Sequence, residues 1–434
     1  MSELKKVVVD KKVIVPFILI TSLFALWGFA NDITNPMVAA FKTVMEISNA
    51  KAAMVQFAFY GGYATMAIPA ALIIKRYSYK VGILIGLGLY AIGALLFYPA
   101  AQYEIFGFFL VSLYILTFGL AFLETTANPY ILSMGAPETA TRRLNLAQAF
   151  NPMGSILGMF VASKLILSAL ESDKRDAGGN LIFETLSAAE KAVIRTNDLA
   201  VIRNPYVILG FVVIVMLIII AVAKMPKQES ADHEVHPWHS AKRLFKNKIY
   251  REGVIAQVFY VGAQIMCWTF IIQYADNLGI PKAEAQNYNI VAMAIFITSR
   301  FISTFLMKYL NPRFMLTLFA FGGMLTTTGV ILIQGMPGLY LLVATSAFMS
   351  LMFPTIYGIA LEGVREDATL GAAGLVMAIV GGALMPPLQG FIIDQGTIGF
   401  LPAVNFSFIL PFICFVVIAI YGMRTYLALK HQSV

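Results

Sequence analysis

The chain has 434 residues, of which 59% are hydrophobic and only 12% are charged, whereas soluble globular proteins carry roughly 25% charged residues. This composition excludes an ordinary water-soluble domain, and the apolar stretches are too continuous for the alternating strands of an outer-membrane barrel. The net charge of +8 lies mostly in short loops, which indicates membrane topology and contact with a lipid bilayer, not binding of nucleic acid. Cys267 and Cys414 lie inside apolar segments, so we expect neither a disulfide nor a metal site.

The apolar stretches predict twelve transmembrane helices, because a helix needs about 20 apolar residues to cross the hydrocarbon core. The first six are expected near 14–40, 52–75, 80–101, 106–133, 144–170 and 205–225. The other six are expected near 251–277, 286–307, 313–333, 338–362, 370–395 and 402–427. The sequence therefore predicts an all-α membrane protein with two six-helix bundles, 1–225 and 251–434, joined by a cytoplasmic linker at 226–250.

Lysine and arginine residues set the expected orientation of these helices. With twelve crossings, their clusters fall on one side of the membrane, at 5–12, 75–80, 142–143, 224–251, 308–313, 365 and 424–430. The opposite short loops, at 100–104, 335–338 and 395–400, carry none. Because cytoplasmic loops are enriched in Lys and Arg, we expect both termini in the cytoplasm and a multi-pass protein of the bacterial inner (plasma) membrane.

One outer segment, 168–204, is long and of mixed charge. Ser187 and Glu190 have the spacing of a capping box immediately before an apolar run. We therefore expect a short amphipathic helix that lies on the outer surface, with a gating element as the alternative.

Two acidic residues are predicted at membrane depth, Asp32 in the first span and Glu124 in the fourth. A charged side chain at the centre of a membrane helix costs about 2.5–3.5 kcal/mol on insertion scales, so each acid is a candidate functional group. Asn35 lies about one turn after Asp32, and Asn128 shares a helix face with Glu124. The alternative is a structural role in which these polar groups bond one another.

A neutral sugar presents many hydroxyl groups, which carboxylates, amides and aromatic faces complement. The fifth span carries a polar stripe, and the first, seventh and tenth spans carry aromatic residues and amides at membrane depth. The candidate sugar-binding residues are Glu124, Gln148, Asn151, Asn128, Trp27, Gln264, Trp268 and Tyr357. For the aromatic residues, an ordinary core or an aromatic belt at the membrane surface is the alternative.

The chain resembles the fucose:proton symporter family of the major facilitator superfamily along essentially its whole length. The matching stretches are 24–28, 56–63, 77–82, 123–129, 143–151, 260–264, 267–268 and 347–350. The resemblance implies the major facilitator fold, alternating access, and import of L-fucose or a related hexose such as galactose or glucose. It also implies that Glu124, Gln148 and Asn151 contact the sugar.

The proton-coupling position departs from the pattern of that family. Members carry a first-helix aspartate that is tied to proton uptake, and ungapped matching from Trp27 places it on Asn35. An asparagine does not titrate, whereas Asp32 lies one turn earlier. We therefore expect Asp32 to carry the proton in place of Asn35.

The sequence thus predicts a sugar:proton importer without a cofactor, and L-fucose is the first candidate substrate. The alternatives are a sodium-coupled or uncoupled glucose or galactose transporter, and a sugar sensor that does not transport. The chain has no P-loop and no catalytic constellation, so an enzyme is not expected. Arg143 lies in a basic connection between the fourth and fifth spans and is a candidate gating residue, with positive-inside anchoring as the alternative.

Overall fold

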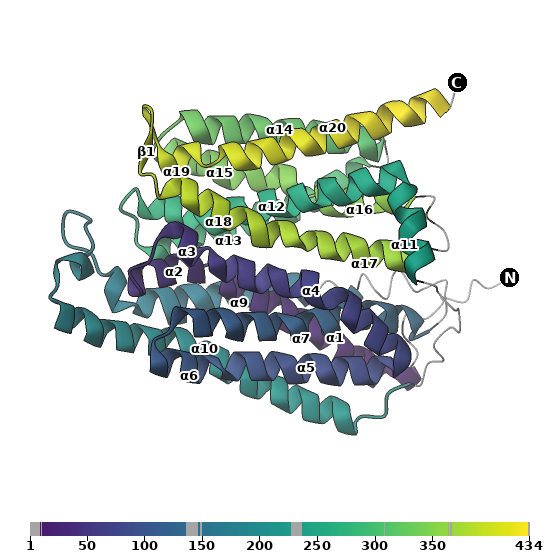
Figure 1. The fold of residues 1–434 in the computed structure, drawn as a ribbon, viewed down its shortest axis with the longest axis horizontal. Helices are drawn as coiled ribbons and strands as arrows, with labels where there is room; N and C mark the ends of the chain where they lie inside the picture. The colour runs from purple at the N-terminus through teal and green to yellow at the C-terminus, as the bar shows by residue number, and fades with distance from the viewer. Residues whose placement is uncertain are drawn as a thin grey trace. The chain divides into compact units, whose positions relative to one another are not determined.

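The structure is a computed structural model, which describes residues 9, 11–135, 146–147, 150–226, 237–307, 309–362, 364 and 367–432. This part of the chain is almost entirely helical, as predicted (Figure 1). Its one sheet is a two-stranded hairpin, in which β1 (Thr397–Ile398) pairs antiparallel with β2 (Leu401–Pro402).

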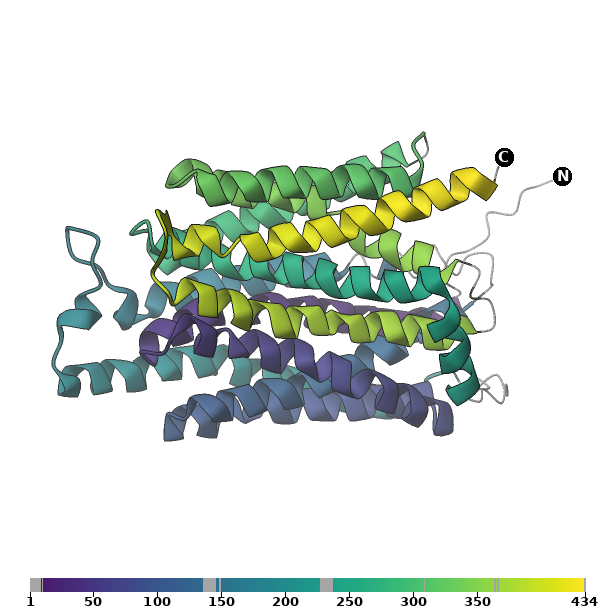
Figure 2. The same ribbon diagram turned by 45° about the horizontal axis from the view of Figure 1, so that its top comes forward.

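The chain divides into two compact units. Unit 1 comprises the described residues of Met1–Thr34, Thr65–Ala169 and Ala192–His233, and unit 2 those of Asn35–Ala64, Leu170–Lys191 and Glu234–Val434. In each unit the long helices lie side by side (Figure 2). Two helices, α4 (Met54–Arg76) and α10 (Ala188–Val222), have residues in both units.

The other helices of unit 1 are η1 (Lys11–Val13), α1 (Ile14–Thr34), α5 (Tyr79–Leu95), α6 (Phe97–Tyr103), α7 (Phe106–Ser133), α9 (Phe150–Val161), η3 (Ala162–Ile166) and η4 (Leu167–Ala169). Those of unit 2 are α2 (Met37–Val44), α3 (Asn49–Ala52), η5 (Glu171–Asp173), η6 (Ile182–Thr185), α11 (Pro237–Lys246), α12 (Lys248–Asp276), α13 (Lys282–Leu306), α14 (Pro312–Leu332), α15 (Met336–Met349), α16 (Met352–Leu361), α17 (Ala368–Met377), η8 (Ala378–Val380), α18 (Gly381–Ile393), α19 (Ala403–Phe406) and α20 (Ile409–Gln432).

Eleven segments of the described chain are long and apolar enough to cross a membrane. They are Ile14–Val44, Asn49–Ile74, Tyr79–Tyr103, Phe106–Ala127, Phe150–Ala169, Ala188–Val222, Lys248–Asp276, Pro312–Leu332, Met336–Leu361, Ala373–Ile393 and Ala403–Leu429. The remaining expected span, 286–307, coincides with α13. That helix carries Gln286, Asn289 and Arg300, which lower its hydropathy.

Glycines let the helices of unit 1 approach closely. A Cβ atom on Gly154 of α9 would lie 1.9 Å from the carbonyl oxygen of Ala25 in α1, and one on Gly28 would lie 2.1 Å from the carbonyl oxygen of Asn151. A Cβ on Gly119 of α7 would lie 2.4 Å from the carbonyl oxygen of Gly86 in α5. Small residues at such contacts let helix backbones pack closely in lipid, where hydrophobic burial cannot drive association, so these glycines have a packing role.

In unit 2, helix α12 is the most enclosed span, because 78% of its most apolar stretch is buried. A Cβ on Gly381 of α18 would lie 1.9 Å from the carbonyl oxygen of Val258, and Gly253 packs against Ala360 and Tyr421. Helices α16, α18 and α20 therefore lie directly against α12.

The short helix α3 is anchored to the end of α18. The Asp394 carboxylate accepts hydrogen bonds from the backbone N–H groups of Asn49 and Ala50, at 2.8 and 2.9 Å, and from the Asn49 side chain at 2.7 Å. A Cβ on Gly390 would lie 2.7 Å from the Asn49 carbonyl group, so the two backbones touch. These contacts fix the segment that links α2 to α4 within unit 2.

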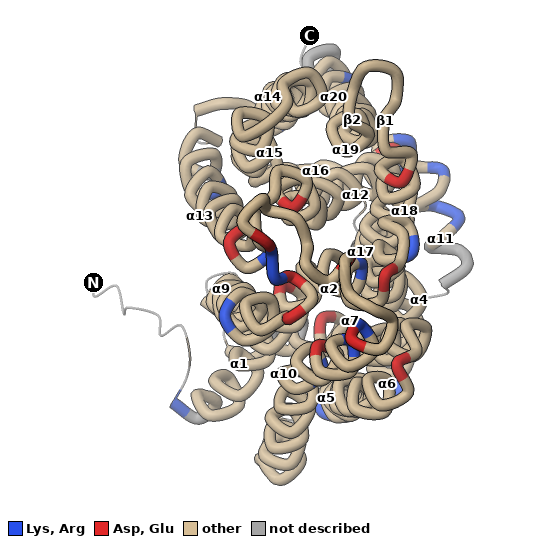
Figure 3. The backbone as a smooth tube through the Cα atoms, turned by 90° about the vertical axis from the view of Figure 1, so that its left-hand side faces the viewer, with Lys and Arg blue, Asp and Glu red and all other residues tan. Residues whose placement is uncertain are grey.

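A cluster of four charged residues ties the segment 170–191 to α12 and α13. The Lys282 ammonium group, whose side chain is 0% exposed, donates to Asp173 at 2.7 Å and to Asp276 at 3.2 Å. The Arg175 guanidinium forms an ion pair with Asp276. Figure 3 shows acidic and basic residues next to one another at this end of the helices. The four charges balance, as buried charges must.

The capping box expected at Ser187 is present. The Ser187 backbone N–H donates to Glu190 Oε2 at 3.0 Å, and the Glu190 backbone N–H donates to Ser187 Oγ at 3.4 Å. The helix that it begins is not the expected short surface helix, however, since α10 continues through Pro205 to Val222. That part of the prediction was wrong.

Contacts with other helices explain why α10 continues far beyond the apolar run that follows its capping box. Within unit 1, the Thr196 hydroxyl donates to the Glu104 carboxylate, and the Arg203 guanidinium lies 4.6 Å from the ring centre of Tyr98. These contacts hold the part of α10 between Thr196 and Arg203 against α6, and Pro205 removes one backbone donor without ending the helix.

Candidate functional site

Asp32 lies in the interface between α1 and α9. It is 1% exposed, and it is four residues after Gly28, so both residues lie on the face of α1 that contacts α9. The Asn31 side-chain amide lies 3.4 Å from Asp32 Oδ2 and donates to it. The predicted depth of this carboxylate therefore agrees with its burial in unit 1.

The end of α1 is held by hydroxyl groups. The Thr34 hydroxyl contacts the Ala30 carbonyl oxygen at 2.8 Å and the Tyr206 hydroxyl at 3.0 Å. Tyr206 in turn stacks on Phe97, with ring centres 3.9 Å apart. This contact fixes the α1 terminus against α6 and α10 in unit 1.

Asn35, the position that matches the family aspartate, lies in unit 2 and is nearly buried, at 7% exposed. Its side-chain oxygen accepts a hydrogen bond from Gln56 Nε2 at 3.0 Å. The same Gln56 nitrogen donates to the Thr269 hydroxyl of α12 at 2.9 Å. Asn35 is therefore part of an amide–hydroxyl network, and Asp32 and Asn35 fall in different units.

Glu124 projects from α7 away from α5. Leu116, Gly119 and Leu123 face α5, and Glu124 lies about 105° around the helix from their mean direction. The neighbouring Thr125 hydroxyl donates to a backbone carbonyl of its own helix, at 2.7 Å. The residue as a whole is half-buried, while the Oε2 atom of its carboxylate is buried.

Asn151 and Trp27 lie near one another along the α1–α9 contact. The Asn151 side-chain amide donates to the Phe24 carbonyl oxygen at 3.3 Å, one turn before Trp27 and Gly28. The Trp27 ring is tilted against that of Phe24, with centres 6.1 Å apart, and both Trp27 and Asn151 are half-buried. Among the predicted site residues whose side chains are described, Trp27, Asp32, Glu124 and Asn151 therefore lie in unit 1.

Three predicted residues are outside this description. Gln148 and Arg143 lie outside the described residues, and for Asn128 the structure describes the helical backbone of α7 and not the side chain.

The predicted residues of unit 2 lie on α12 and α16. Trp268 is 8% exposed, and its Nε1–H donates to the Ser346 hydroxyl at 3.1 Å while its ring meets Phe296 edge-on. Gln264, one turn earlier on α12, is half-buried. Trp268 thus has the contacts of a core residue, in line with the alternative reading of the aromatic residues.

Tyr357 belongs to an aromatic cluster between α12 and α16. It is half-buried and stacks on Phe353, with ring centres 6.3 Å apart, and Phe353 meets Tyr260 edge-on at 6.1 Å. The Tyr260 hydroxyl donates to the Met349 carbonyl oxygen at 3.1 Å. In this cluster Tyr357 and Phe353 are both half-buried, whereas Tyr260 is fully buried.

Two buried glutamines, Gln56 and Gln257, were not predicted as site residues. Gln56 is 0% exposed and bridges Asn35 and Thr269. Gln257 is also 0% exposed, and neither polar atom of its amide has a hydrogen-bond partner among the described residues. Gln257 precedes Gln264 by seven residues on α12, so a search for amides on one helix face would have found it.

Comparison with known proteins places the chain in a family. The model of the Major Facilitator Superfamily matches residues 18–386. An L-fucose-proton symporter of Haemophilus influenzae is 73% identical over 425 residues, which cover 98% of this chain and 99% of that protein. An L-fucose-proton symporter of Escherichia coli is 35% identical, with 95% of this chain and 93% of that protein covered.

The fold agrees with this relationship. The crystal structure of a major facilitator transporter, FucP, in the outward conformation has a TM-score of 0.70 and 33% sequence identity. The match covers 96% of this chain and 99% of that chain. All three proteins are named as transporters or symporters, and none as an enzyme. The chain therefore belongs to the major facilitator superfamily and, within it, to the family of the L-fucose-proton symporters.

Proposed function

We propose that this protein imports L-fucose together with a proton by alternating access. The observation that carries the proposal is the 73% identity to an L-fucose-proton symporter over 98% of the chain. The carboxylate of Glu124 and the amide of Asn151 support it, since both are polar groups in otherwise apolar helices of a membrane transporter.

The sugar is bound mainly by polar residues of the first six spans. The Glu124 carboxylate accepts hydrogen bonds from sugar hydroxyl groups, and the Asn151 amide both donates and accepts. Gln148 and Asn128 add amides, while Trp27 offers an aromatic face. Gln264 and Tyr357 of the later spans are further candidate sugar contacts, whereas Trp268 packs as a core residue of unit 2.

Asp32 is the proton carrier in this proposal. Its burial supports the role, because adding a proton removes a charge from a site that water does not reach. Protonated Asp32 favours loading of sugar from outside, and loss of the proton to the cytoplasm favours release and return. Asn35 contributes hydrogen bonds and no proton.

The protein lies in the inner (plasma) membrane of a bacterium with both termini in the cytoplasm. The distribution of Lys and Arg between the two sets of loops supports this orientation. Arg143, in the cytoplasmic connection between the fourth and fifth spans, is proposed to act in gating.

Uptake of labelled hexoses into vesicles tests the proposal. Vesicles that contain the protein are given L-fucose, galactose or glucose, with a proton gradient or a sodium gradient imposed separately. We expect uphill accumulation of L-fucose on the proton gradient alone. Accumulation on the sodium gradient, a preference for glucose or galactose, or binding without uptake would each contradict the proposal.

A further inference from the structure

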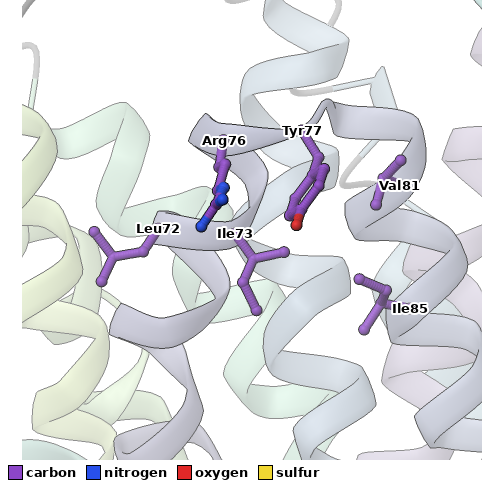
Figure 4. Close-up of a pocket in the computed structure, with 6 residues that line it drawn as sticks. All are labelled: Leu72, Ile73, Arg76, Tyr77, Val81 and Ile85. Carbon is purple, nitrogen blue, oxygen red and sulfur yellow. The ribbon is translucent and has the colours of Figure 1, made fainter.

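A groove lies on unit 1 where α4 ends and α5 begins. It has a volume of about 490 Å³, within the roughly 300–1,000 Å³ of small-molecule sites. Its lining residues are Leu72, Ile73, Arg76, Tyr77, Val81 and Ile85 (Figure 4). Four of the six are aliphatic, and the two polar side chains come from adjacent positions at the end of α4.

The groove is closed at the back and open at the front. At the back the helices touch, since a Cβ on Gly82 would lie 2.7 Å from the Ile74 side chain, and Ile74 is buried against Ala70 and Phe122. At the front, the Leu72 side chain is 54% exposed although it belongs to a membrane-spanning segment. The described protein therefore does not cover the front of the groove, which leaves it open to lipid.

No described residue neutralises the charge of Arg76. The residue is exposed, and among the described residues it forms no ion pair or hydrogen bond, while its guanidinium carbon lies 5.7 Å from the ring centre of Tyr77. Figure 4 shows the Arg76 guanidinium and the Tyr77 hydroxyl both pointing toward the aliphatic lining. The nearby Lys80 is already used, because its ammonium group donates to the carbonyl oxygens of Ala221 and Ala223 at 2.8 and 2.9 Å.

We propose that this groove binds an anionic phospholipid. The phosphate accepts hydrogen bonds from the planar Arg76 guanidinium, which matches two phosphate oxygens, and the Tyr77 hydroxyl donates to the headgroup. One acyl chain lies along Leu72, Ile73, Val81 and Ile85. The site is separate from the sugar and proton residues, and its existence does not depend on which substrate the protein carries.

Charge complementarity selects this occupant over others. Inorganic phosphate would leave the aliphatic walls unused, and an uncharged hydrocarbon would leave Arg76 without a counter-ion. A zwitterionic phospholipid would bring its own cation toward the guanidinium. The α4–α5 connection lies on the basic side of the predicted topology, where anionic headgroups attract Lys and Arg.

Native mass spectrometry of the purified full chain tests the proposal. The protein is titrated with palmitoyl-oleoyl phosphatidylglycerol and, separately, with the matching phosphatidylcholine, and the apparent Kd of the first bound lipid is compared. We expect Arg76→Gln to weaken phosphatidylglycerol binding about fivefold and to leave phosphatidylcholine unchanged, since one interfacial Arg contributes about that factor. Arg76→Lys should retain most of the preference.

Two further variants separate the groove from general effects. Leu72→Trp fills the apolar part and should weaken both lipids, whereas Lys51→Gln removes an equal charge near the opposite end of α4 and should change neither. Sugar binding by each variant shows that it has folded. An unchanged lipid preference in Arg76→Gln, an equal loss in Lys51→Gln, or displacement of the lipid by inorganic phosphate would overturn the proposal.

Discussion

Glu124 is the residue on which sugar binding should depend most. Glu124→Gln keeps the shape of the side chain and removes its charge, so a charge-assisted hydrogen bond to the sugar is lost. We expect a cost of about 1.5–3 kcal/mol, or roughly ten- to hundredfold weaker binding, with a smaller loss for Asn151→Ala. Titration calorimetry with L-fucose measures it. Glu171→Gln, the same change in an outer loop, is the control, and wild-type affinity in both site variants would exclude these contacts.

Asp32 should couple sugar transport to the proton gradient. Asp32→Asn mimics the protonated state permanently, because the amide bears no charge and occupies nearly the same volume. Exchange of labelled for unlabelled sugar across loaded vesicles should persist, while accumulation driven by a pH gradient should disappear. The matched variant Asn35→Gln leaves Asp32 intact and should still accumulate sugar uphill. Should Asp32→Asn also accumulate sugar on a proton gradient, Glu124 becomes the leading proton carrier.

The depth of single residues could be predicted from the sequence, and their pairing could not. Asp32 stands out because it interrupts an apolar stretch, and its burial agrees with that reading. The bonds from Gln56 to Asn35 and to Thr269 join positions 21 and 213 residues apart in the chain. Such contacts depend on how the helices pack, which one sequence does not reveal.

At the scale of helices, Gly154 should control the α1–α9 contact. Gly154→Ala places a methyl group 1.9 Å from the Ala25 carbonyl oxygen, which belongs to a backbone and so does not rotate away. Overpacking of this kind costs about 1–3 kcal/mol, so the Tm in detergent should fall by several degrees. Sugar binding should weaken as well, since Asn151 lies one turn earlier on α9.

The control for this prediction is Gly107→Ala at the beginning of α7. A Cβ at Gly107 meets nothing within 4 Å, so circular dichroism should record an unchanged Tm. Equal Tm values for the two variants would show that α1 and α9 separate without cost, contrary to the packing described for unit 1.

Helix boundaries illustrate the limit of sequence reasoning at this scale. The capping box at Ser187 marks a true helix start, because its hydrogen bonds are local. The end of that helix was misplaced, because Pro205 and the polar turns before it look like a break in sequence. Contacts with α6, which are distant in sequence, decide that the helix continues.

For the whole molecule, the number of spans was predictable because each apolar run is long enough to define one helix. Residues 35–64 belong to unit 2 together with the later part of the chain. Units 1 and 2 follow packing, whereas the predicted bundles 1–225 and 251–434 follow chain order. The division into bundles 1–225 and 251–434 therefore stays a prediction.

Orientation in the membrane gives a prediction for the whole chain. Cys267 and Cys414 are both free and buried, so membrane-impermeant maleimides should not label the wild-type protein in intact cells. Tyr103→Cys creates an exposed thiol in a loop predicted to lie outside, and Lys246→Cys creates one on the cytoplasmic side. We expect labelling of the first variant alone, and labelling of both after the membrane is opened. The reverse pattern would invert the assigned topology.

The cluster of Lys282, Asp173, Asp276 and Arg175 governs how the attachment of segment 170–191 responds to salt in the surrounding medium. Exposed ion pairs weaken as dissolved ions screen them, whereas buried pairs are screened much less. The four side chains are between 0% and 11% exposed, so dissolved ions have little access to them. The segment 170–191 should therefore stay attached to α12 and α13 at low and at high ionic strength. A change in external salt concentration should then leave this part of the transporter in place.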